Sequence, residues 1–156
     1  MKKTILTILT MAFVSLSAFA DDKQDALNFF NNYVKAANSY DASVAAMYSP
    51  SAKIIRQVIK PDGTLVDVST DTATYIRQMK IGQAGAKLKN YKNNYTNITA
   101  AAMPNGGYKV SSLRQPSNET YKLKTYMIVK KQPDGKWLIT EEMMQTKVQT
   151  FLKYQK

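Results

Sequence analysis

The chain has 156 residues, of which 44% are hydrophobic and 10% aromatic, a composition typical of a folded domain rather than a disordered one. It contains neither cysteine nor histidine, which excludes disulfides, thiolate or imidazole metal sites, a Ser-His-Asp triad and a histidine-ligated haem. With 22 basic against 11 acidic side chains the formal net charge is +11, and the length predicts one domain. We expect no metal and no cofactor.

The first twenty residues have the pattern of a cleaved signal peptide. Two lysines form a basic start, residues 4–17 are mostly apolar, and Ala18 and Ala20 are the small residues expected before a cleavage site after Ala20. An uncleaved membrane anchor is disfavoured because the apolar run is short and contains Thr and Ser. The bacterial style of the signal predicts a periplasmic or secreted protein whose mature chain, residues 21–156, is a single domain.

Helical spacing dominates the start of the mature chain. A helix is predicted over 22–38 because its apolar side chains recur on one face, namely Leu27, Phe30, Tyr33, Val34 and Ala37. Asp41 is expected to cap a short second helix over 41–49. Asp71 opens a third helix over 71–81, and two glycines weaken the segment beyond it.

Alternating and β-branched residues predict strands in the remainder. Segments 53–60 and 64–69 form a hairpin around Pro61-Asp62-Gly63. Later strands are expected over residues 91–103, 108–115, 120–131 and 136–148, with Pro133-Asp134-Gly135 as the strongest turn signal. Three helices and a hairpin therefore precede four antiparallel strands, which indicates an α+β fold with its helices on one side of a bent antiparallel sheet.

This element order resembles the nuclear transport factor 2-like superfamily of cone-shaped α+β domains. Residues 126–139, with the sequence YMIVKKQPDGKWLI, are similar to the family's habitual ending, in which a hydrophobic strand turns at Asp-Gly-Lys-Trp into the last strand. The resemblance covers residues 22–148. A cystatin-like domain, with one helix on a four-stranded meander, fits the two further helices and the hairpin less well. The resemblance implies a pocket between sheet and helices.

The last hairpin predicts which residues face that pocket. If Gln132 lies opposite Lys136, strict alternation places Glu141 and Met143 on the more apolar face, where Arg56 could pair with Glu141 or with an anionic ligand. Tyrosines with polar tips and adaptable methionines would complete the pocket. The predicted ligand-binding residues are Tyr33, Tyr48, Arg56, Tyr75, Met79, Met127, Glu141 and Met143. Ordinary core packing for the tyrosines and methionines, and solvent exposure for the two charges, are the alternative interpretations.

The resemblance leaves the function open, because some members use Asp, His and Tyr for acid–base chemistry while others bind ligands or assemble. The last strand lacks the histidine of many acid–base members, and Asp41 is better interpreted as a helix cap. We therefore expect an exported, non-enzymatic domain that binds a small apolar or amphipathic ligand, or a partner protein, through the pocket or the sheet face. The alternatives are an acid–base lyase or isomerase that uses Glu141 and a tyrosine, and a secretion or envelope assembly module.

Charge and sheet architecture predict two further surfaces. No acidic residue occurs between positions 72 and 118, and an anion-facing surface is expected at Arg77, Lys80, Lys87, Lys89 and Lys92. For an exported protein this indicates an anionic envelope surface rather than nucleic acid, with simple solubilisation as the alternative. A homodimer is expected through the open sheet face, which by strict alternation carries Tyr126, Ile128, Leu138 and Met144.

Overall fold

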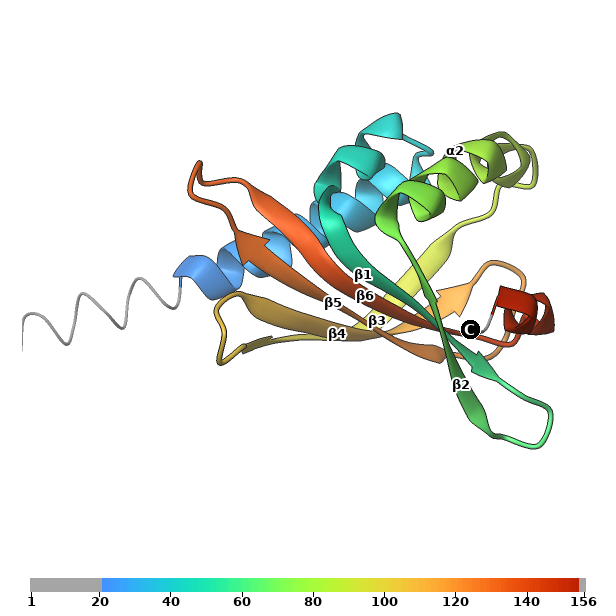
Figure 1. The fold of residues 1–156 in the computed structure, drawn as a ribbon. Coiled ribbons are helices and arrows are strands. Elements are labelled where there is room, and N and C mark those ends of the chain that lie inside the picture. The colour runs from blue at the N-terminus through green and yellow to red at the C-terminus, as the bar shows by residue number, and fades with distance from the viewer. Residues whose placement is uncertain (1–20, 155–156) are drawn as a thin grey trace, which may run out of the picture.

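The computed structural model describes residues 21–154, in which helices cover one side of a curled six-stranded sheet (Figure 1). The predicted signal peptide and its cleavage site after Ala20 lie outside the described residues. A helix occupies residues 21–38, a 3-10 helix η1 (Ala42–Met47) follows, and α2 (Thr72–Leu88) comes after the first hairpin. None of the helices within the described part of the chain is long and apolar enough to cross a membrane.

The sheet brings an early strand of the chain beside its last strand. Its strands are β1 (Tyr48–Ile59), β2 (Leu65–Thr70), β3 (Asn93–Ala102), β4 (Tyr108–Pro116), β5 (Leu123–Lys131) and β6 (Trp137–Thr146), in the spatial order β2-β1-β6-β5-β4-β3. All neighbouring strands run antiparallel except β1 and β6, which are parallel. The last element, the 3-10 helix η2 (Gln149–Tyr154), lies against β1 and β2. The predicted α+β fold is confirmed, with this parallel pair as the addition.

The two largest differences from the predicted boundaries lie at the start of β1 and at the end of α2. The second helix ends at Met47 and β1 begins at Tyr48, so Pro50 lies inside a strand. Proline is tolerated there because the β1–β6 register shifts between Tyr48 and Lys53, where the ladder does not require a regular N–H donor. In addition, α2 continues through its two glycines to Leu88, seven residues beyond the predicted end, because no proline stops it.

The core forms between the first helix and the inner face of the sheet. Ala26, Phe30 and Tyr33 recur at helical spacing and are buried. They pack with buried residues of β4, β5 and β6, namely Val110, Met127, Val129 and Ile139. Trp137 packs against this cluster, with its ring centroid 6.3 Å from that of Tyr108.

A β-bulge in β6 reverses the predicted alternation. The turn itself is as predicted, since the Gln132 N–H donates to the Lys136 carbonyl at 2.7 Å and Val129 pairs with Ile139. The next pair is Ile128 with Glu141, so Thr140 is an extra residue on β6. Beyond it, every side chain changes face relative to strict alternation.

The bulge corrects three predictions about which residues face the core. Glu141 and Met143 lie on the outer face, and their assignment to the pocket face is wrong. Glu142 and Met144 face the core instead, opposite Met127 and Thr125. Met144 is therefore absent from the outer sheet face, where Met143 takes its place.

Candidate functional site

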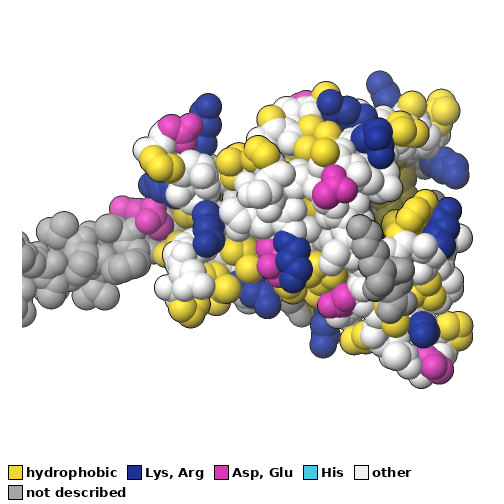
Figure 2. Space-filling view, viewed as in Figure 1, with side chains coloured by type: hydrophobic (Ala, Val, Ile, Leu, Met, Phe, Trp, Pro, Cys, Tyr) yellow, Lys and Arg dark blue, Asp and Glu magenta, His cyan; other side chains and the backbone are white. Residues whose placement is uncertain are grey.

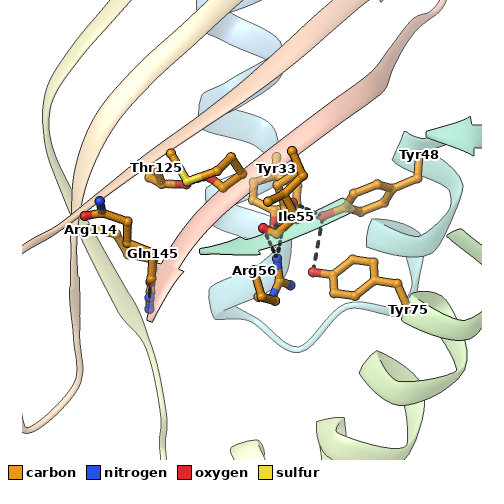
Figure 3. A network of polar contacts seen from close by, with 10 residues as sticks. Tyr33, Tyr48, Ile55, Arg56, Tyr75, Arg114, Thr125 and Gln145 are labelled. Atoms are coloured by element: carbon orange, nitrogen blue, oxygen red, sulfur yellow. Dashed lines mark hydrogen bonds and ion pairs between the residues drawn. The ribbon is translucent and has the colours of Figure 1, made fainter. Parts of the chain in front are cut away.

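A buried ion pair lies at the centre of the inner sheet face. The Glu142 side chain is 1% exposed, and Arg56 Nη1 donates to its Oε1 at 3.0 Å. The Tyr48 hydroxyl donates to Glu142 Oε2, and the Tyr33 hydroxyl lies 3.5 Å from the same oxygen (Figure 3). Both carboxylate oxygens are therefore occupied by donors.

The parallel pairing of β1 with β6 brings the two charges together. Ile54 lies opposite Glu142, and Arg56 lies opposite Met144. Paired residues share a face of the sheet, and so do residues two apart on one strand. Arg56 therefore projects on the same side of the sheet as Glu142, from a position opposite Met144. An ion pair between residues 86 positions apart thus depends on a strand pairing that no local turn specifies.

Three tyrosines from different elements enclose the ion pair. Tyr33 comes from the first helix, Tyr48 from the start of β1 and Tyr75 from α2. The hydroxyl of Tyr48 is 3.2 Å from that of Tyr33 and 3.4 Å from that of Tyr75. The Arg56 guanidinium carbon also lies 4.8 Å from the centre of the Tyr75 ring, a cation–π distance. The network therefore links both helices to the sheet.

The environment of these phenols determines their protonation. Burial, and then the negative charge of Glu142, raise the pKa of Tyr33 and of Tyr48 well above its ordinary value. The same two causes raise the pKa of Tyr75, although the nearby Arg56 partly offsets them. The hydroxyls, which are protonated at neutral pH like ordinary phenols, therefore stay protonated in alkaline solution as well and serve as hydrogen-bond donors rather than bases.

A cavity of about 260 Å³ adjoins this network, between the helices and the sheet. Part of its wall is apolar and is formed by Ala37, Val44, Met79, Gly82, Ala86 and Met144. Polar groups also reach it, and they include Arg56, Tyr75, Asn93, Tyr95 and Arg114. The volume lies slightly below the roughly 300–1,000 Å³ of sites for drug-sized ligands, so it suits a compact molecule.

The predicted ligand-binding residues divide into three groups. Tyr33, Arg56, Tyr75 and Met79 line the cavity. Tyr48 belongs to the network around Glu142, and Met127 is buried in the core. Glu141 and Met143 lie on the outer sheet face, where the Tyr126 hydroxyl donates to Glu141 Oε1 at 2.7 Å. The prediction of an Arg56–glutamate pair was therefore right in kind and wrong by one residue.

Sequence reasoning misses several residues of the cavity and of the network beside it. Strict alternation places Glu142 and Met144 on the other face, because the bulge at Thr140 has no clear sequence signature. Arg114 carried a usable signal, since it shares the alternation of Tyr108 and Val110 along β4 and so falls on the inner face.

The remaining predicted residues lie at the surface. All five predicted anion-facing side chains are exposed on or just after α2, namely Arg77, Lys80, Lys87, Lys89 and Lys92. Ile81 and Leu88 on the same helix are 75% and 89% exposed, and Figure 2 shows basic and hydrophobic side chains side by side at this end of the molecule. Asp41 accepts a hydrogen bond from the Ser43 N–H at 2.8 Å, which confirms its capping role.

The acidic side chains are the candidates for a possible metal site. Within residues 21–154 no group of three or more His, Cys, Asp or Glu side chains is arranged to hold a metal ion.

Comparisons with known proteins identify the architecture. The chain matches no family model and no curated protein sequence. It is similar in structure to an NTF-2 like protein of unknown function from Shewanella oneidensis MR-1, with 16% identity, 79% of this chain and 98% of that chain covered, and a TM-score of 0.58. The chain has the nuclear transport factor 2-like fold.

Two further solved structures with similar folds are named for different functions. Nuclear transport factor 2 from Cryptosporidium parvum shares 11% identity over 78% of this chain and 91% of its own, with a TM-score of 0.56. A candidate ketosteroid isomerase from Shewanella frigidimarina NCIMB 400 shares 14% identity over 76% of this chain and 93% of its own, with a TM-score of 0.55. The fold thus occurs in structures named as a transport factor and as an isomerase, so function has to be argued from the site.

The buried position of Glu142 can be tested against its neighbour in sequence. Glu142→Gln removes the counter-charge of a buried arginine and should lower the free energy of unfolding by about 3–5 kcal/mol. Glu141→Gln changes a partly exposed side chain and should cost about 1 kcal/mol or less. Urea denaturation of both variants measures the difference. A larger loss for Glu141→Gln would contradict the bulged register.

Alkaline titration tests the environment of the tyrosines. All ten tyrosines lie within residues 21–154. In the unfolded state they ionise near pH 10, whereas the raised pKa values of Tyr33 and Tyr48 keep these two protonated in the folded state. The unfolded state thus loses protons first, and stability should fall as the pH rises above about 10. Phenolate absorbance should show exposed tyrosines ionising rapidly and the buried ones only on unfolding; a single rapid step for all ten would contradict this.

Proposed function

We propose that this protein is a non-enzymatic binding protein that holds a compact amphipathic ligand in the cavity between its helices and sheet. The observation that carries this proposal is the chemistry of the cavity wall. Apolar side chains such as Met79, Ala86 and Met144 alternate with hydrogen-bond donors such as Tyr75 and Arg56. Sites of this kind bury an apolar body and orient it through a few polar groups.

The carboxylates near the cavity argue against catalysis. A general base has to come within hydrogen-bond reach of the proton that it removes. Glu142 is almost completely buried, is already bonded to Arg56 and Tyr48, and is absent from the cavity wall. Asp41 does line the cavity, but its bond from the Ser43 N–H lowers its pKa and makes it a weak base. The cavity thus offers donors without an available base.

The alternative function is an acid–base lyase or isomerase. The catalytic pair that the sequence suggests, Glu141 with a tyrosine, lies on the outer sheet face and does not reach the cavity. The bond from the Tyr48 hydroxyl to Glu142, with the Tyr75 hydroxyl 3.4 Å from that of Tyr48, is the observation that favours this alternative. It requires Glu142 to exchange its present partners for a substrate.

Export and two further surfaces complete the proposal. The basic and apolar start of the chain supports a periplasmic or secreted location. The exposed basic side chains of α2 are adjacent to cavity residues of the same helix, which supports an approach to anionic envelope components. A homodimer through the outer sheet face, which carries Tyr126, Ile128, Leu138 and Met143, also remains a proposal.

The ligand can be sought directly and its place tested with paired variants. Mass spectrometry of compounds released from protein purified from its native periplasm should recover a small amphiphile. With 2-naphthol as an uncharged probe, Ala86→Trp should abolish binding by filling the cavity. Ala84→Trp, on the exposed side of the same helix, should leave binding unchanged. Isothermal titration calorimetry measures both.

Two outcomes would contradict this proposal. Equal binding of 2-naphthol by both tryptophan variants would place the ligand outside the cavity. Chemical conversion of a recovered compound, lost in Tyr75→Phe, would establish the enzymatic alternative instead.

A further inference from the structure

We propose that Arg114 forms an anion-binding site inside the cavity, so that the ligand is an apolar molecule with a carboxylate or similar oxyanion head group. This inference rests on the proposed function, because it names the chemical class of the ligand that occupies the same cavity. It starts from the contrast between the two arginines that line the wall, Arg56 and Arg114.

The first observation is a buried positive charge without a counter-ion. Arg114 is only 5% exposed, and among residues 21–154 no carboxylate lies within ion-pair distance of its guanidinium. Arg56, in contrast, is neutralised by Glu142. A buried charge is strongly unfavourable unless it is paired, so an anion bound at Arg114 would recover an interaction that the chain itself does not provide.

The second observation is an unsatisfied donor on the same side chain. Arg114 Nη1 donates to Asn93 Oδ1 at 2.8 Å, and Nη2 donates to the Gln145 carbonyl at 2.9 Å. The buried Nε–H has no acceptor among the described residues. Both acceptors are neutral, so the two bonds position the guanidinium without cancelling its charge. Figure 3 shows Arg114 beside Gln145, apart from the cluster around Arg56.

The two residues that hold Arg114, Asn93 through its side chain and Gln145 through its backbone carbonyl, are themselves fixed. The Asn93 N–H donates to Asn38 Oδ1, and the Asn38 amide donates to the Asn93 carbonyl, both at 2.9 Å. The side-chain amide of Gln145 donates to Gln57 at 2.9 Å. These bonds tie the guanidinium to the first helix, β3, β6 and β1. A preorganised donor of this kind binds an anion without a further ordering cost.

The surrounding charge also favours an anion. Asp41 is the one acidic side chain among the described residues that line the cavity, and it is exposed to water and engaged in capping η1. Residues 72–118, which supply α2 and about half of the residues that line the cavity, contain only basic charges. The resulting field draws anions towards the opening. Tyr95 and Met144 line the same cavity and offer a surface for an apolar body.

The test uses three probes with the same ring and different charges: 2-naphthoate, uncharged 2-naphthol and cationic 2-naphthylmethylamine. Calorimetry at neutral pH should show that the wild-type protein binds 2-naphthoate at least tenfold more tightly than 2-naphthol, and 2-naphthylmethylamine most weakly. A charge-assisted hydrogen bond accounts for a preference of roughly ten- to a hundredfold.

Variants then assign this preference to one side chain. Arg114→Gln should remove the preference for 2-naphthoate and leave the affinity for 2-naphthol within about twofold of wild type, since neutral probes do not need the charge. Arg114→Lys should retain part of the preference. Lys23→Gln, which removes one positive charge from an exposed site on the first helix, should retain all of it.

The outcomes separate this inference from the proposed function. If wild-type protein binds 2-naphthoate and 2-naphthol equally, or if Arg114→Gln keeps the tenfold preference, the anion site is wrong while cavity binding stands. If none of the three probes binds, the proposed function fails and this inference fails with it. The wild-type preference requires no variant, so misfolding of Arg114→Gln would not leave the proposal untested.

Discussion

The buried ion pair between Glu142 and Arg56 is the interaction on which the interior of this molecule depends. Removing both charges from water carries a large desolvation cost, which the protein offsets with hydrogen bonds from the surrounding phenols. Those phenols come from the first helix, β1 and α2. Tyr33 and Tyr48 approach the carboxylate directly, and Tyr75 joins them through the Tyr48 hydroxyl. The network around the carboxylate therefore fixes the helices on the sheet, and with them the shape of the cavity.

This arrangement also determines what the cavity can bind. Because Arg56 and Tyr48 occupy the Glu142 carboxylate, the interior loses its strongest potential base and presents donors to a ligand. Arg114 lies in the same cavity without a comparable partner. One arginine thus serves the structure and the other remains available for an anion, a division of roles that follows from where the single buried carboxylate of residues 21–154 lies.

Local sequence signals predict the helices and strands well. They do not predict the pairing of distant strands or the face on which each side chain of β6 lies. Turn residues such as Pro133-Asp134-Gly135 specify which consecutive strands form hairpins, and the α+β order follows from them. The parallel pairing of β1 with β6 has no such local signal, because the two strands are far apart in the chain. The bulge at Thr140 inserts one residue into an otherwise regular ladder, so every face assigned beyond it was reversed, including that of Glu142.

The central claim is that Glu142 and Arg56 act as one buried unit, and a double-mutant cycle measures this most directly. Glu142→Leu, Arg56→Met and the double variant should be compared with the wild-type chain of residues 21–156 by urea denaturation. We expect each single variant to leave an unpaired buried charge and the double variant to be clearly more stable than the sum of the losses implies, with a coupling of about 2 kcal/mol or more. Losses that add to within about 0.5 kcal/mol would contradict the account, because they would show that the two side chains act independently.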